Sequence, residues 1–285
     1  MSEYLIQENT LKGIADAIRT KRETTDKILV EDMATEIINI DTSAADKKPF
    51  IDTSKITDFA YFCINDRMND EVHLIDTSNG VQFNHMFMGS EKLEVVPEID
   101  TSRCTYFNGM FSECRNLRSI PKLNTSKGTS FSNMFSDCTS LPSKCVAELD
   151  LSNGTDFSGM FAFCSNLIDI PKLNIKNGRE FGNMFAVCYS LRSIGLSIPN
   201  GNLEPSTFSE CYSLETVTID EGWDVSIYLH YSEQLTVECL HRMIENLADI
   251  TERDIVRTFQ VGEINLGKID AEHIAMLDAK GWIYS

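Results

Sequence analysis

The chain has 285 residues, enough for one to three domains, and 42 % of them are hydrophobic, so it can bury a sizeable core. Acidic residues outnumber basic ones by 43 to 25, a formal net charge of −18, which argues against nucleic acid or an anionic membrane surface as the partner. No secretory signal, no run of about 18 apolar residues and no C-x-x-C pair is visible, so we expect a reduced, cytosolic chain with no membrane insertion.

Residues 9–40 have the pattern of two short helices separated by Arg22-Glu-Thr-Thr-Asp26. Asn9 is a candidate N-cap, and the first helix has one apolar face. Helices this short are marginal alone, so we expect the hairpin within residues 1–45 to dock on the rest of the chain or on another protein. The text T-L-K-G-I-A-D-A-I-R-T-K resembles an N-terminal segment of phage tail and tail-fibre proteins of Gram-positive hosts, although Arg22-Glu23 stands where that motif has a glycine.

An internal repeat, F-x-x-M-F-x-x-C-x-x-L, dominates the middle of the chain. Full copies begin at Phe107, Phe131, Phe157 and Phe181, and an earlier copy at Phe83 has Ser90 in place of the cysteine. A landmark Asp or Asn precedes each copy by seven residues: Asp76, Asp100, Asn124, Asp150 and Asn174. The spacing is 24 residues except for one interval of 26 around Cys145, where two extra residues should bulge on one face.

Each repeat predicts a short strand, a turn and a short helical segment. The text L-x-x-I-P-x-L-N favours a strand that ends at its proline, and F-x-x-M-F places apolar residues on one helical face. One unit cannot bury that face alone, so we expect an α/β repeat solenoid over residues 50–230, curved and right-handed, with equivalent residues about 4.8 Å apart. Its internal ladders would include Phe111, Cys114, Phe135, Cys138, Phe161, Cys164, Phe185 and Cys188.

The text N-x-M-F-x-x-C-x-x-L-x-x-I-P-x-L-N-T-S resembles the BspA-type leucine-rich repeat over roughly residues 50–220. That type occurs on bacterial cell-surface proteins and in phage and prophage tail proteins. The resemblance implies a leucine-rich-repeat-like fold that binds host or cell-surface targets through the solenoid, and it implies no catalytic activity.

Residues 231–285 predict an α+β module that caps the open end of the solenoid. An amphipathic helix begins near Leu235, residues 258–262 alternate like a strand, and Asp270 can cap a helix that runs through Leu277. Residues 215–285 carry 14 acids and five bases, which indicates a separate unit. The segment resembles the C-terminal module that often closes prophage-encoded repeat proteins.

No catalytic residue, metal site or cofactor is predicted. The cysteines occur once per repeat and lack the paired spacing of a zinc site, so core packing explains them better. The Asp or Asn residues also occur once per repeat, short of the six to eight oxygen ligands of calcium, so hydrogen bonds within their own turns explain them better. Cys239 and His241 are two residues apart and do not face each other on a helix. The histidines are dispersed in sequence: His73, His85, His230, His241 and His273.

Function is therefore expected at the surface, beside the repeat Leu and Ile positions. Candidate binding residues are Glu94, Arg118, Ser119, Lys122, Asp169, Lys172 and Arg192.

Three hypotheses follow. The first is a non-enzymatic phage or prophage tail protein, made in the host cytoplasm and carried in the virion, which binds other tail proteins through residues 1–45 and a host protein or glycan through the solenoid. The second is a bacterial surface adhesin. The third is an intracellular phage-encoded effector that inhibits a host defence protein. The oligomeric state stays open, since no sustained heptads occur.

Overall fold

The computed structural model describes residues 53, 55–66, 76–197 and 201–285. The hairpin predicted over residues 9–40 lies outside these ranges. The described elements, in chain order, are η1 (Ile64–Asp66), α3 (Ser143–Ala147), β1 (Asp169–Leu173), β2 (Ser193–Leu196), β3 (Thr216–Ile219), β4 (Ile227–Tyr228), α4 (Val237–Asn246), β5 (Thr258–Gln260), α5 (Glu263–Leu266), α6 (Ala271–Ala279) and β6 (Ile283–Tyr284).

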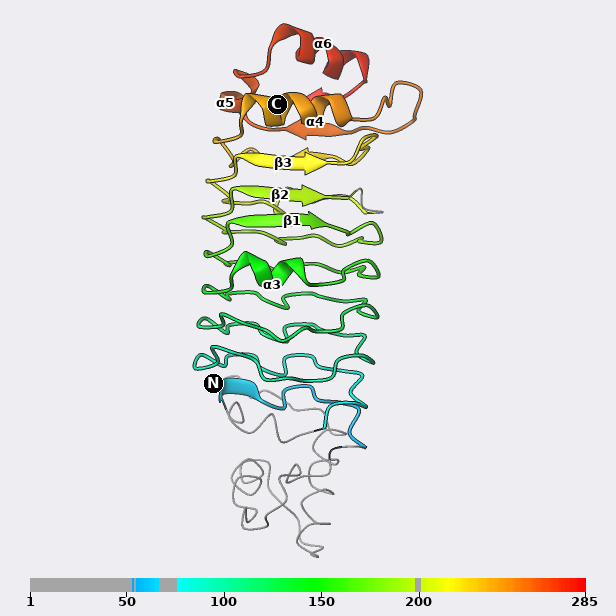
Figure 1. The fold of residues 1–285 in the computed structure, drawn as a ribbon. Helices are drawn as coiled ribbons and strands as arrows, with labels where there is room; N and C mark the ends of the chain where they lie inside the picture. The colour runs from blue at the N-terminus through cyan, green and yellow to red at the C-terminus, as the bar shows by residue number, and fades with distance from the viewer. Residues whose placement is uncertain (1–52, 54, 67–75, 198–200) are drawn as a thin grey trace, which may run out of the picture.

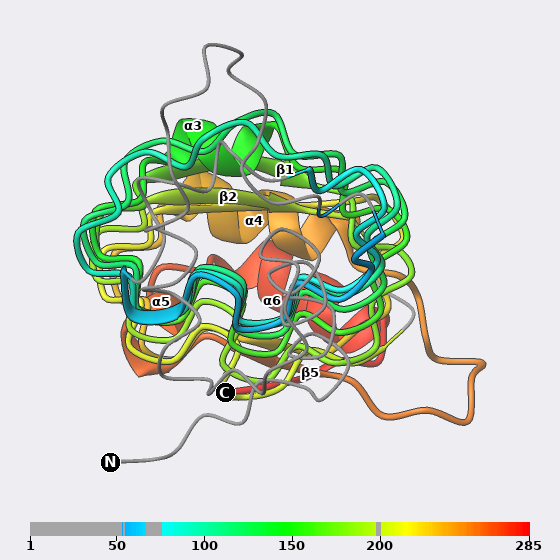
Figure 2. The same ribbon diagram turned by 90° about the horizontal axis from the view of Figure 1, so that it is seen from below.

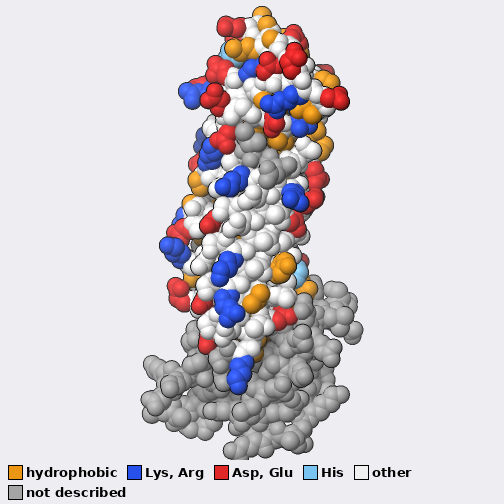
Figure 3. Space-filling view, turned by 90° about the vertical axis from the view of Figure 1, so that its right-hand side faces the viewer, with side chains coloured by type: hydrophobic (Ala, Val, Ile, Leu, Met, Phe, Trp, Pro, Cys, Tyr) orange, Lys and Arg blue, Asp and Glu red, His pale blue; other side chains and the backbone are white. Residues whose placement is uncertain are grey.

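The chain winds in successive turns that stack along one nearly straight axis, without the marked curvature that we expected (Figures 1 and 3). On one side of the stack, single parallel bridges join each turn to the next. They run from Asp58 to Gln82, Tyr106, Ser130, Asp156 and Glu180. Each step spans 24 residues except the step from Ser130 to Asp156, which spans 26. The repeat length of the sequence is therefore the length of one turn.

The other side of the stack carries β1, β2 and β3, which pair in parallel and in that order. The two extra residues around Cys145 are taken up by α3, which packs against β1. Pro171 lies within β1 and not at its end as predicted. The register of β1 with β2 shifts between Ile170 and Leu173, because Pro171 has no backbone N–H to donate to the neighbouring strand.

The F-x-x-M-F segments form turns, and not the short helices that their apolar spacing predicted. The N–H groups of His85 and Phe87 donate to Asn108 and Met110 of the next turn, at 2.8 and 2.9 Å, while Met86 bonds back to Phe83. His85 and Gly89 have positive φ, and this four-residue rhythm recurs in the later copies. In each of these segments two left-handed residues, four positions apart, interrupt the helical hydrogen bonds and direct alternate N–H groups along the stack.

Columns of phenylalanine fill the interior of the stack. The first Phe of the repeat stacks in Phe59–Phe83 and in Phe107–Phe131–Phe157–Phe181, and the second in Phe87–Phe111–Phe135–Phe161–Phe185–Phe208. Ring centroids are 5.3–5.8 Å apart and interplanar angles are 1–18°. A single 24-residue unit is too small to form its own core, and the stacked units share this continuous apolar core instead.

In the earlier turns a threonine at the corner after the strand position joins neighbouring turns, as Thr53, Thr77, Thr101 and Thr125 do, whereas Leu151 and Ile175 hold this position later. Thr101 Oγ1 donates to the carbonyl of Asn124 at 3.1 Å and accepts from its N–H at 2.9 Å. The Asn124 side chain accepts from the N–H of Ser126, two residues on, as Asp76, Asp100 and Asp150 do in their own turns. Figure 3 views the side on which the strands end, where few hydrophobic side chains are visible and Lys and Arg are spaced along the stack.

The C-terminal segment closes the stack (Figure 1). The helix α4 packs against β3, in line with the strands, whereas α5 and α6 cross the end of the stack (Figure 2). Short parallel strands in the order β4-β5-β6 form a second sheet. Asp270 caps α6 by accepting from the N–H of His273 at 2.9 Å, which confirms the helix start predicted there.

Further polar contacts attach α6 and β6 to α4. Lys280 Nζ donates to the carbonyls of Glu245 and Leu247 at 2.7 Å, at the end of α4 where carbonyls lack helical partners. Trp282 Nε1 donates to the carbonyl of Ala248 at 2.9 Å, and Trp282 itself is buried. The last residues of the described chain are thus held by both packing and hydrogen bonds.

The phenylalanine columns predict a sharp contrast between two nearby residues. Phe161 is fully buried between Phe135 and Phe185, whereas Phe163 is 50 % exposed. We expect Phe161→Ala to lower the free energy of unfolding by about 3–5 kcal/mol, because a large cavity opens in the stack. Phe163→Ala is the matched control and should change it by no more than about 0.5 kcal/mol. Urea unfolding followed by circular dichroism measures both, and equal effects would contradict this account of the core.

Candidate functional site

The predicted surface residues lie in columns on the side that carries β1–β3. Ser119 bridges to Val95, and Asp169 pairs with Ser193. Glu94, Arg118, Lys122, Asp169, Lys172 and Arg192 are exposed, and Ser119 is half-buried. The register of the turns therefore brings residues 24 or more positions apart in sequence next to one another.

Two of the four cationic candidates are paired with acids of later turns. Arg192 donates to both carboxylate oxygens of Glu215, at 2.9 and 3.0 Å, and this contact raises the pKa of Arg192 and lowers that of Glu215. Lys172 forms an ion pair with Asp220. Within the described ranges Arg118 and Lys122 have no ion pair. These two side chains are the ones best placed to meet an external acidic group.

A column of exposed tyrosines borders this side, and the sequence analysis did not identify it. Tyr189 and Tyr212 stack with centroids 5.9 Å apart, and Tyr231 meets Tyr212 edge-on at 6.3 Å. They are 46, 49 and 39 % exposed. Tyr189 and Tyr212 each follow a repeat cysteine directly, in the text C-Y-S, so their position in the repeat was a usable signal. Tyrosine and arginine are the residues in which binding energy concentrates at protein interfaces.

The repeat cysteines belong to the core. Each thiol donates to the carbonyl of the second Phe of the preceding turn, at 3.0–3.1 Å, in Cys114, Cys138, Cys164, Cys188 and Cys211. Ser90, at the same position in an earlier turn, donates to the carbonyl of Cys63 at 3.0 Å. Burial raises the pKa of Cys104 and of Cys211 to about 12, and it raises the pKa of Cys138, Cys164 and Cys188 as well.

Thiol chemistry tests this assignment. All nine cysteines are buried, and burial disfavours the charged form of a thiol, so the reactive thiolate is a minor species at pH 8. We expect Ellman's reagent to modify none of them rapidly in the native protein and all nine after unfolding in guanidinium. A thiol that reacts within seconds in the native state would show that one of these side chains is accessible and ionised.

A groove of about 450 Å³ lies between β3 and α4. Its lining mixes threonines of β3 and of the α4 cap with charged and polar residues of α4, including Thr216, Thr218, Thr236, Glu238, Arg242 and Asn246. Glu238 Oε1 and Arg242 Nε lie 3.6 Å apart, one helical turn apart on the α4 wall of the groove. The groove follows from the replacement of a strand by a helix at this position in the stack.

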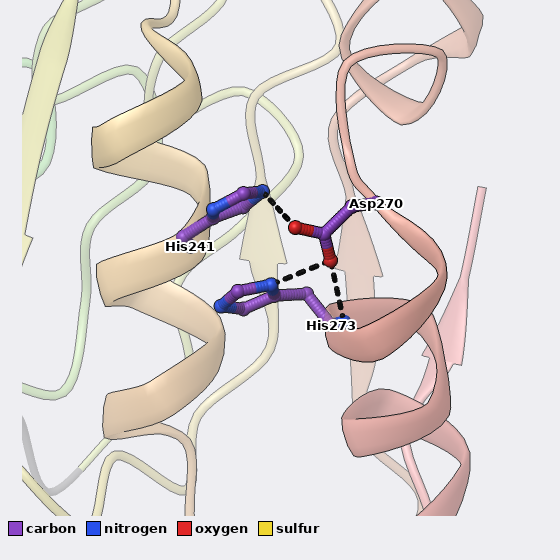
Figure 4. Close-up of side chains that lie close together, drawn as sticks. All are labelled: His241, Asp270 and His273. Carbon is purple, nitrogen blue, oxygen red and sulfur yellow. Dashed lines mark hydrogen bonds and ion pairs between the residues drawn. The ribbon is translucent and has the colours of Figure 1, made fainter.

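Two histidines that are 32 residues apart in sequence meet between α4 and α6 (Figure 4). The rings of His241 and His273 stack with centroids 3.7 Å apart and an interplanar angle of 10°. Asp270 faces both: its Oδ1 lies 2.7 Å from His273 Nδ1, and its Oδ2 lies 3.6 Å from His241 Nε2. The His273 backbone N–H, and then its ring, hold the pKa of Asp270 below its usual value.

Glu245 completes the surroundings of this cluster, with Oε1 3.7 Å from His273 Nε2. Ligand atoms of His241, Asp270 and His273 lie within 4.8 Å of one another, close enough to share a metal ion. His241 and His273 are dispersed in sequence, yet the packing of α6 on α4 brings their rings together, which the sequence did not predict. The capping role of Asp270 was readable in the sequence, but the partner helix was not.

A family model described as "Mycoplasma protein of unknown function, DUF285" matches residues 31–143 and 94–196, which together span 31–196. This is more than half of the chain, and the protein belongs to that family. No curated protein and no solved structure gives a match. Within the residues that the structure describes, no helix is both long enough and apolar enough to cross a membrane.

Proposed function

We propose that the protein is a non-enzymatic recognition protein whose stack of turns is a right-handed leucine-rich-repeat-like solenoid. The interior of the described turns is occupied by phenylalanine and cysteine columns and by bonds between turns, which leaves the outer surface for binding. The observation that carries the proposal is the exposed column Tyr189–Tyr212–Tyr231, whose first member precedes Arg192 and the strand β2 by a few residues in the chain. We name this column, with Arg118, Lys122 and Arg192, the tyrosine-edged face.

We further propose that recognition occurs in a phage or prophage tail, with a host cell-surface protein or glycan as the target. Two features support this context: the resemblance of the repeat to BspA-type repeats, and the resemblance of residues 10–37 to tail-protein N-termini. Residues 1–45 would then attach the protein to other tail components, and the tyrosine-edged face would meet the target.

The face can be tested with a pair of matched variants. We expect Tyr189→Ala/Tyr212→Ala to weaken binding to cells of the source organism by at least about 30-fold, because buried Tyr anchors each contribute about 2 kcal/mol at an interface. Tyr106→Ala is the control, since Tyr106 is also exposed but lies on the bridge side of the stack. Both variants should keep the thermal midpoint of the wild type, because the mutated rings are partly in solvent. Equal losses in the two variants, or none in the double variant, would contradict the assignment of the face.

The tail context has its own test in a deletion of residues 1–45. After prophage induction, we expect the full chain to sediment with tail particles and to resist a high-salt wash, and the deleted chain to remain soluble. The deleted chain should still unfold cooperatively at the wild-type temperature, because the columns of the stack begin at Phe59. Normal incorporation of the deleted chain would refute the docking role.

The same fractionation separates the two alternatives. A full chain that is absent from particles and resists protease shaving of intact cells would favour an intracellular effector. A full chain that is absent from particles and is removed by shaving would favour a surface adhesin. In either outcome the tyrosine-edged face can still be the binding surface, so its test stands apart from the test of the tail context.

A further inference from the structure

Two buried ring nitrogens between α4 and α6 lack a hydrogen-bond partner: Nε2 of His241 and Nε2 of His273. His273 is only 9 % exposed. Buried polar atoms in folded proteins are nearly always bonded to protein or to another ligand, so each of these nitrogens requires an explanation. Neither nitrogen is explained by the cap of α6, which uses only the Asp270 carboxylate and the His273 backbone N–H.

The contacts of Asp270 with the two rings differ. Its Oδ1 lies at hydrogen-bond distance, 2.7 Å, from His273 Nδ1, so an ion bound to that nitrogen would replace this bond, and the two nearly parallel rings would tilt apart to direct their lone pairs at the ion. His241 Nε2 and Asp270 Oδ2 are 3.6 Å apart, which is too long for a hydrogen bond. Two ligands of a tetrahedral zinc-class ion, each about 2.0–2.2 Å from the metal, lie about 3.4 Å from each other. His273 Nδ1 lies on the same side of the ring pair, facing the same carboxylate (Figure 4).

We propose that His241 Nε2, His273 Nδ1 and Asp270 Oδ2 bind one divalent transition-metal ion, with water as the fourth ligand. Two imidazoles and one carboxylate are donors that suit Zn²⁺, Co²⁺ or Ni²⁺, whereas Mg²⁺ and Ca²⁺ prefer oxygen ligands alone. The side chain of Asp270 is 52 % exposed, so the fourth position is open to solvent.

Glu245 is a positioning residue for this site. When the metal is bound to Nδ1 of His273, the ring proton resides on Nε2, which lies 3.7 Å from Glu245 Oε1. At 3.7 Å the two atoms are not hydrogen-bonded, but a metal-binding histidine commonly donates its second ring N–H to a carboxylate, so we expect Glu245 to move closer when the ion binds. The arrangement accounts for both unpartnered nitrogens, one as a ligand and the other as a donor to Glu245.

The ion would join α6 to α4 at the start of α6. Lys280 already joins them at the end of α6, through the carbonyls of Glu245 and Leu247. With both ends held, the C-terminal module would resist local opening. The site therefore stabilises the closing module of the stack, and it is independent of the proposed recognition function.

The test uses the full chain, stripped of metal with EDTA and titrated with Co²⁺ at about pH 7.5, where most imidazoles are neutral. We expect one Co²⁺ per chain, visible d–d absorption of a tetrahedral site, displacement by Zn²⁺, and a thermal midpoint that rises with Zn²⁺ concentration. His241→Gln should weaken binding at least 10-fold, and Glu245→Gln by about 10- to 100-fold.

Asp270→Ser separates the metal site from the helix cap. Serine is as good an N-cap as aspartate, so this variant should keep the metal-free thermal midpoint while losing Co²⁺ binding. His230→Gln removes an exposed histidine of the same module outside the cluster and should bind Co²⁺ like the wild type.

Several results would overturn the proposal. One is a wild-type chain that shows no saturable Co²⁺ binding, and another is an Asp270→Ser variant that binds like the wild type. Intense thiolate-to-metal absorption in the near ultraviolet would place the ion on cysteine instead. A thermal midpoint that responds to pH between about 5 and 7 in EDTA, but not to metal, would identify the stacked pair as a protonation site.

Discussion

The backbone hydrogen bonds between successive turns set the geometry on which every other feature depends. They require equivalent residues to lie side by side, so one favourable side chain per repeat becomes a continuous column. The pairs of left-handed residues, four positions apart in each turn, make this possible. They direct alternate N–H groups along the axis of the stack instead of toward carbonyls of the same helix. Even Val187, a β-branched residue, takes this conformation with φ 64°. The hydrogen bonds between turns therefore outweigh the preference of a β-branched residue for negative φ.

This register also determines where binding can occur. A column that is buried, such as the cysteines, is committed to bonds with the preceding turn. A column that is exposed, such as Tyr189–Tyr212–Tyr231, places like side chains close together without any further structure. The arrangement suits a flat, extended contact with a macromolecule.

The C-terminal module follows different rules, because repetition ends there. The helix α4 takes the place of a strand beside β3, and α6 is attached to it by individual polar contacts. A histidine pair and two carboxylates gather at this junction, where no column dictates the residue type. The specific chemistry of the molecule is thus found where the periodic pattern stops, and the family match ends at residue 196, before this module.

The sequence by itself determined the repeat, its 24-residue length, the buried columns and the cap of α6, because periodic apolar residues and capping residues are local signals. It also identified the seven surface candidates, but only as positions beside the buried leucines. Tertiary structure alone decided that F-x-x-M-F is a turn, since the competing bond partners lie in the next turn, 22–25 residues away. It likewise decided that His241 meets His273, because the angle at which α6 packs on α4 is set by contacts that no local pattern encodes.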